Sequence, residues 1–289
     1  MTITKTITKT ITKENFGSKA KFFKMETLLI GISLVYITLI IFLPALNVFT
    51  EAFKNGVVPF ISNFSNQEFL SAIRLTLIIA FVCVPVNTVF GLCAAWAIAR
   101  HKFPGRAFII SVIDLPFSIS PVVAGLMIVL LYGRQGWFGE ILEKINLKIV
   151  FATPGIILAT AFITLPFVAR EVIPVLEEMG REQEEAARTL GAKDWQIFWR
   201  VTLPNIRWGL LYGVILTNAR AMGEFGAVAV VSGNIAGETQ SLPLFVEQAY
   251  KQYQTQEAFS AAVLLGLLAL VTLVAKTIVE QKTQIKDVE

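Results

Sequence analysis

Long apolar stretches separated by short polar segments dominate the sequence. A helix that crosses a membrane needs about 20 predominantly apolar residues. Six stretches are long enough, at approximately residues 27–49, 69–98, 107–131, 149–168, 209–231 and 258–279. A transmembrane β-barrel would instead show segments of about ten residues with alternating polarity. The pattern therefore predicts an all-α integral membrane protein with six transmembrane helices.

The composition supports a membrane protein over a soluble one. Of the 289 residues, 55% are hydrophobic and 16% are charged, whereas soluble proteins carry about 25% charged residues. The net charge of +4 could indicate a nucleic-acid partner, but such proteins gather their basic residues on a soluble face. The composition thus excludes a soluble nucleic-acid-binding protein and a disordered chain.

Lysine and arginine residues are unevenly distributed between the two ends of the predicted helices. With a cytoplasmic N-terminus, the inner segments are residues 1–26, 98–106, 170–207 and 276–289. These segments hold eighteen of the 25 basic residues, and the three outer loops hold five. Because basic residues favour the cytoplasmic side, we expect both termini inside and a multi-pass protein of a bacterial inner membrane.

The chain divides into three predicted parts. Residues 1–26, with their TITKTITKTITK repeat, are expected to form a basic, flexible cytoplasmic tail. Residues 27–280 form the six-span transmembrane domain, and residues 281–289 a cytoplasmic C-terminal tail. A cleaved signal peptide is the alternative for the start, but the first apolar stretch is too long for one, which favours an uncleaved first helix.

Few side chains could support catalysis or metal binding. The single histidine is His101, which lies in a basic segment before a proline. Cys83 and Cys93 would lie about 15 Å apart along a helix, too far for a disulfide. This set offers no metal cluster or redox motif. We therefore predict a non-catalytic chain that binds no cofactor and no metal.

The inner loop, residues 170–207, is the longest loop. Loops of such length are usually functional or disordered, and this one has helix-forming composition over residues 182–190. Ala186, Ala187 and Leu190 would give that helix an apolar side. The loop is therefore predicted to offer small and apolar residues to a cytoplasmic partner, as in other helix-in-groove contacts, or to lie at the membrane interface.

The second half of the inner loop predicts a turn and another short helix. Gly191 suits the left-handed residue that ends a helix. Asp194 is expected to cap a helix that runs to Arg200, and Leu203-Pro204 is expected to end it. Two short helices at an angle would result.

The inner loop resembles the EAA loop of ABC-importer permeases, whose pattern is EAA-x3-G-x11-LP. In that family the loop forms the coupling helix that docks on the ATPase subunit. The resemblance assigns ATPase coupling to Glu185, Ala186, Ala187, Gly191, Leu203 and Pro204. The chain itself lacks the G-x-x-x-x-G-K-[ST] phosphate loop. ATP and Mg²⁺ would therefore be used by a partner ATPase and not by this chain.

The fifth apolar stretch carries two charges. Arg220 would lie near the middle of the bilayer, where a charge is costly and is usually paired or faces a pathway. Glu224 follows four residues later and can pair with Arg220 on one helix face. The pair could order the helix bundle or form a gate, and Arg220 could contact an anion. Asn218 lies on the same stretch.

Two serines in the third apolar stretch complete the candidate pathway residues. Ser118 and Ser120 could offer hydroxyl groups to an oxyanion, although hydrogen bonds to the helix backbone are the favoured interpretation. With Arg220, Glu224 and Asn218 they form the predicted pathway or gate.

Residues 218–233, NARAMGEFGAVAVVSG, resemble the sulfate and thiosulfate importer permeases, and their core also resembles molybdate permeases. Further segments extend the resemblance from about residue 28 to residue 280, with the TITK repeat outside it. These segments are VPVN at 84–87, FPGR at 103–106, PFSISPVVAG at 116–125 and LPNIRW at 203–208.

The resemblance implies a permease subunit of an ATP-driven importer for sulfate and thiosulfate that works by alternating access. Its partners would be a homologous permease subunit (CysT-like), two ATPase subunits (CysA-like) and an external sulfate-binding protein. The same machine for molybdate, tungstate or another oxyanion is the alternative. A secondary anion transporter, which would usually show inverted repeats, and an intramembrane enzyme are more distant alternatives.

Overall fold

The computed structural model describes residues 27–286, and all regular structure within them is helical. The predicted N-terminal tail, residues 1–26, and the last three residues of the predicted C-terminal tail lie outside the described residues. The chain divides into two compact units, Met1–Glu51 and Ala52–Glu289.

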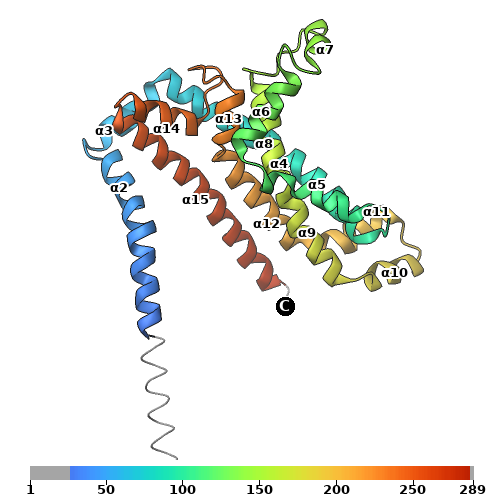
Figure 1. Ribbon diagram of the computed structural model, residues 1–289. Coiled ribbons are helices and arrows are strands. Elements are labelled where there is room, and N and C mark those ends of the chain that lie inside the picture. Colours follow the sequence, from blue (N-terminus) through green and yellow to red (C-terminus); the bar gives the residue numbers. More distant parts are fainter. Residues whose placement is uncertain (1–26, 287–289) are drawn as a thin grey trace, which may run out of the picture. The chain divides into compact units, whose positions relative to one another are not determined.

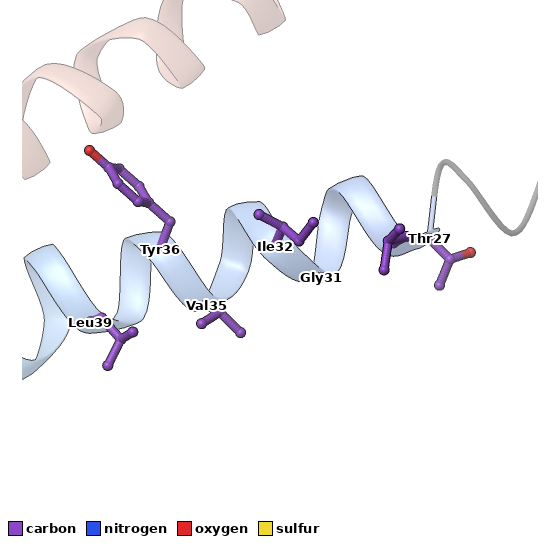
Figure 2. A pocket seen from close by; sticks show the side chains of 7 residues that line it. Thr27, Gly31, Ile32, Val35, Tyr36 and Leu39 are labelled. Carbon is purple, nitrogen blue, oxygen red and sulfur yellow. The ribbon is translucent and has the colours of Figure 1, made fainter.

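The first unit contributes one long apolar helix. Residues 27–37 are helical and continue through a π-helical turn, η1 (Thr38–Phe42), into α2 (Leu43–Ala52). Within this unit, apolar side chains are exposed on every side of the helix. Figure 2 shows Tyr36 projecting from one side of it and Val35 and Leu39 from the opposite side, along an open apolar surface. Such a helix suits contact with lipid or with another protein chain.

The second unit is a helical bundle (Figure 1). Its elements are α3 (Val57–Ser62), η2 (Asn63–Ser65), α4 (Gln67–Arg100), α5 (Arg106–Ser118), α6 (Pro121–Tyr132), α7 (Gly139–Lys144), α8 (Thr153–Thr164), α9 (Pro166–Met179), α10 (Glu182–Thr189), α11 (Asp194–Ile197), η3 (Phe198–Thr202), α12 (Leu203–Met222), α13 (Gly226–Val231), α14 (Leu242–Lys251) and α15 (Thr255–Lys286). In Figure 1, α10 and α11 lie at one end of this unit and α7 at the other.

Helices α4, α9 and α12 form the centre of the bundle and touch at backbone distance. A Cβ atom on Gly91 of α4 would lie 2.7 Å from Cβ of Val168 of α9. A Cβ atom on Gly213 of α12 would lie 2.8 Å from Cα of the same valine. Small residues allow such close approach between membrane helices. Val168 is therefore enclosed between two glycines of neighbouring helices.

A polar side chain, Asn87, forms hydrogen bonds at the break between α8 and α9. Pro166 has no N–H group and interrupts the helical hydrogen bonding there. Asn87 of α4 donates to the carbonyl oxygen of Ala161 at 2.9 Å and to Oγ1 of Thr164 at 2.7 Å. Pro166 cannot donate to the carbonyl oxygen of Phe162, which accepts instead from the N–H of Leu165 at 3.4 Å. This shift leaves the carbonyl group of Ala161 without its helical donor. Because an uncompensated carbonyl group in the membrane is costly, Asn87 satisfies it.

Two of the six predicted spans are wrong as continuous helices. The span predicted for residues 107–131 breaks at Ile119 and Ser120, and α5 and α6 meet at 109°. Ser120 precedes Pro121, and a residue before proline disfavours the α conformation. The span predicted for residues 209–231 breaks between α12 and α13, at residues 223–225.

The predicted number of six spans is therefore not confirmed. Among the described residues, four helices are long and apolar enough to cross a membrane, or five if the bent pair counts as one span. They are Thr27–Ala52, Gln67–Arg100, Thr153–Met179 and Thr255–Val274, with Arg106–Tyr132 as the bent pair. Helix α12 has 20 residues, but its arginines and asparagines make it more polar than these spans.

Candidate functional site

The two broken helices meet at their breaks. Helix α6 begins at Pro121 and α13 begins at Gly226. A Cβ atom on Gly226 would lie 2.8 Å from Cβ of Pro121, and one on Gly125 would lie 2.8 Å from the carbonyl oxygen of Ala227. The glycines thus let the first turns of α6 and α13 pack closely. The break region, residues 118–121 and 220–226, is one candidate site.

Arg220 and Glu224 form the expected ion pair in the break region. Nη2 of Arg220 lies 2.8 Å from Oε2 of Glu224, an ion pair without the angle of a hydrogen bond. The Glu224 side chain is 0% exposed and that of Arg220 is 35% exposed. Oε1 of Glu224 accepts a hydrogen bond from the N–H of Ala227 at 3.0 Å. Glu224 therefore links the end of α12 to the first turn of α13.

The other predicted pathway residues surround the break. Ser118 and Ser120 are both exposed, on either side of the bend between α5 and α6. Asn218 is half-buried, and its Nδ2 lies 4.0 Å from Sδ of Met222. Asn218 and Met222 also line an apolar groove of about 800 Å³ along α4, which includes Arg74. The structure thus gathers the predicted residues around the two breaks, and their roles stay predictions.

A second ion pair links α5 to α9. Nε of Arg170 donates to Oδ1 of Asp114 at 2.6 Å. The guanidinium group also lies over the ring of Phe117, 5.8 Å from its centroid. Since Phe117 directly precedes Ser118, this contact fixes the residues just before the bend.

The inner loop contains the two predicted short helices, α10 and α11, and their connection is as expected. Gly191 has φ +84°, a left-handed conformation that favours glycine. Its N–H donates to the carbonyl oxygen of Arg188 at 2.9 Å, and the N–H of Ala192 donates to that of Ala187 at 3.1 Å. These two hydrogen bonds form a Schellman motif, so the predicted end of the first helix is confirmed.

Three details of the inner loop differ from the expectation. Lys193, and not Asp194, is the N-cap of α11, and its N–H donates to the side chain of Gln196. Asp194 instead pairs with Arg188 at 2.6 Å. The helix also does not end at Leu203-Pro204 as expected, because η3 leads directly into α12. Proline is tolerated there because the first turn of a helix needs no N–H partner.

The exposed surface of the inner loop is partly apolar. Leu190 is 89% exposed, and Trp195 and Trp199 are also exposed. Glu185 and Ala186 are exposed, whereas Ala187 is half-buried. Large exposed apolar side chains at a rim of polar residues are typical of an interaction surface. The loop therefore presents an exposed, partly apolar surface, and the docking role of its residues stays a prediction.

Glu184, which no motif in the sequence singles out, fixes this loop. Its Oε1 accepts hydrogen bonds from Nη2 of Arg100 at 3.0 Å, from Nε of Arg100 at 3.2 Å and from Oγ1 of Thr202 at 2.8 Å. Arg100 also donates to the carbonyl oxygen of Leu176 at 2.9 Å. Arg100 and Glu184 are 84 positions apart, and no periodicity in the sequence pairs them.

Comparisons with known proteins place the chain among transport components. Residues 87–285 match the model of the family described as binding-protein-dependent transport system inner membrane component. The chain is 68% identical to the sulfate transport system permease protein CysW of a Synechocystis strain, over 91% of this chain and 95% of that protein. It is 40% identical to the sulfate transport system permease protein CysT of Escherichia coli K12, over 84% and 89% of the two chains.

Solved structures show the same fold at low sequence identity. A chain in a crystal structure of a bacterial alginate ABC transporter, in complex with an alginate-bound periplasmic protein, superposes with a TM-score of 0.76. That alignment covers 91% of this chain and 97% of the other, at 18% identity.

Proposed function

We infer the function from the family, because the chain belongs to the binding-protein-dependent transport system inner membrane components. It is the membrane permease subunit of an ABC importer. Relatives that are up to 68% identical are named as sulfate permeases, and they support sulfate as the transported anion. Thiosulfate, which shares the charge and tetrahedral shape of sulfate, is the second substrate that we propose.

The ion pair at the two helix breaks is the observation that supports an anion pathway through this chain. Broken helices in membrane transporters commonly line the substrate site. Glu224 is fully buried and holds Arg220 in place, whereas Arg220 remains partly exposed. A guanidinium group has five N–H donors, so Arg220 can attract an anion while it stays paired. We assign Arg220, Glu224 and Asn218, with the hydroxyl groups of Ser118 and Ser120, to a gate in the anion pathway.

We assign the inner loop to coupling with a separate ATPase. Glu185, Ala186 and Leu190 face outward on the loop, and Gly191 sets the angle between its helices. Two ATPase subunits (CysA-like) would bind ATP and Mg²⁺, and the chain itself would bind neither. ATP binding would move the loops and open the pathway outward, and hydrolysis would reset it. The ligands must bind the two states with different affinities for this cycle to work.

The assembly that we propose contains a homologous permease subunit and an external binding protein. The relative named CysT supports a CysT-like partner, and the transporter with a bound periplasmic protein supports an external sulfate-binding protein. The basic inner segments support cytoplasmic N- and C-termini by the positive-inside rule.

Uptake of labelled sulfate tests this function. The complete complex is reconstituted in vesicles with ATP inside and the loaded binding protein outside. We expect uptake that requires ATP, that thiosulfate inhibits and that an equal concentration of molybdate leaves intact. Full competition by molybdate at low concentration would show that the substrate is a different oxyanion. Uptake by the permease subunits without an ATPase would indicate a secondary transporter.

A further inference from the structure

Helix α10 is held to the rest of the chain by polar contacts. None of its residues is buried, so apolar packing does little to fix it. Glu184 instead contacts Arg100 and Thr202, Arg181 donates to the carbonyl oxygen of Arg100, and Gln183 accepts from the side chain of Asn205. Besides the backbone that joins α10 to α9 and α11, these contacts are therefore the links through which a displacement of α10 can reach the membrane helices.

The central contact, which we name the inner joint, consists of Arg100, Glu184 and Thr202. The Arg100 and Glu184 side chains are only 7% and 15% exposed, and a single carboxylate oxygen accepts all three hydrogen bonds. Charge-assisted hydrogen bonds are about twice as strong as neutral ones. The inner joint is thus the most buried and most highly connected polar contact of α10 in the described structure.

The inner joint lies at the ends of two long helices. Arg100 is the last residue of α4, which has 34 residues. Thr202 directly precedes α12, which leads to Arg220 near its other end. Glu184 on α10 therefore holds both the end of α4 and the start of α12. The neighbouring Glu185 is exposed and lies on another side of α10, since consecutive helical residues are about 100° apart.

We propose that the inner joint transmits movement of the docked loop to α4 and α12, and that Glu184 is a positioning residue distinct from the docking residues. The proposal rests on the proposed function, because it presumes an ATPase docked on the inner loop. Glu185 and its exposed neighbours contact the partner. Glu184 converts the displacement of α10 into displacement of the helix that ends at Arg220.

The test compares sulfate uptake with ATP hydrolysis in the complete reconstituted complex. In Glu184→Gln, the amide keeps the size of the side chain but loses the charge that Arg100 binds. We expect the ATPase to co-purify normally and basal ATP hydrolysis to stay within about twofold. Sulfate transported per ATP hydrolysed should fall about tenfold, within the range that is typical of coupling between sites.

The matched control is Glu177→Gln. Glu177 also pairs with an arginine, Arg106, but both side chains are half-exposed, and such pairs contribute little. We expect this control to transport normally. If it lowers the transport ratio as much as Glu184→Gln does, loss of any nearby charge pair explains the effect and the proposal is wrong.

A second variant keeps the proposal testable if Glu184→Gln fails to assemble. Thr202→Val removes one of the three hydrogen bonds and keeps the side-chain shape, so we expect a smaller loss, of roughly threefold, in sulfate per ATP. An unchanged ratio of sulfate transported to ATP hydrolysed in an assembled variant would overturn the proposal for the inner joint. Loss of ATPase co-purification in Thr202→Val would instead make these residues part of docking and would also overturn it. A wild-type complex without ATP-dependent uptake would refute the proposed function separately.

Discussion

The ion pair in the break region gives the sharpest prediction. Arg220→Met removes the partner of a carboxylate that is 0% exposed, and Glu224 keeps only its hydrogen bond from Ala227. Breaking a buried ion pair usually costs about 3–5 kcal/mol. The Arg220 side chain, however, is 35% exposed, so this chain encloses only one partner of the pair completely. We therefore expect a loss of about 2–3 kcal/mol, at or just below the lower limit of that range.

The assay is thermal unfolding of the purified complex, followed by tryptophan fluorescence. A loss of this size should lower the Tm of the permease by roughly 5–10 °C. Adding Glu224→Gln to Arg220→Met removes the buried charge, and the amide oxygen can still accept the hydrogen bond from Ala227. The double variant should recover more than half of the lost Tm. It should not recover sulfate uptake, because the group that attracts the anion is still missing.

The matched control is Arg74→Met. Arg74 is exposed near the start of α4, and among the described residues its replacement leaves no buried carboxylate unpaired. Its replacement should change the Tm little and harm uptake less than Arg220→Met. Equal effects of the two variants on Tm and uptake would refute the reasoning. So would a double variant that is no more stable than Arg220→Met alone.

Three further predictions concern single residues. The backbone of Gly191 has φ +84°, which disfavours any side chain. Gly191→Val should therefore leave assembly intact but reduce sulfate uptake per ATP. The control is Gly105→Val, at a glycine with φ +89° and equally open space around it. Gly226→Ala should lower the Tm by several degrees through a contact at 2.8 Å, whereas Gly223→Ala, whose nearest contact is at 3.5 Å, should be tolerated. Asn87→Leu should cost about 1–3 kcal/mol in thermal unfolding, because it leaves a backbone carbonyl group unpaired, and an unchanged Tm would contradict that role.

Apolar length predicts helices well where nothing interrupts them. Residues 69–98 were predicted as one helix, and α4 covers them completely. The same criterion fails at residues 118–121, because hydropathy measures composition and carries no information about direction. Ser120 and Pro121 turn the chain by 109° while the surrounding residues remain apolar.

The second break has a different cause. The segment from Gly223 to Phe225 contains no proline, and a buried carboxylate stabilises the break by accepting from the N–H of Ala227. The sequence indicated that Arg220 and Glu224 pair, but not that Glu224 also holds the start of a new helix. Likewise, the motif pointed to Glu185, whereas the long-range contact of Glu184 depends on how α4 and α10 pack, which local pattern does not encode.

The enclosure of Val168 between Gly91 and Gly213 has a mechanical consequence. Because Val168 is held between the two glycines, sliding of one helix past another would force it against the neighbouring backbone. We therefore expect α4, α9 and α12 to tilt about that point. Gly213 lies close to the middle of α12. At 1.5 Å per residue, the helix extends about 15 Å from Gly213 to Leu203 and about 14 Å from Gly213 to Met222. The two parts of α12 on either side of this contact are therefore nearly equal in length. A displacement at one membrane face should appear at the other with the same size and the opposite direction.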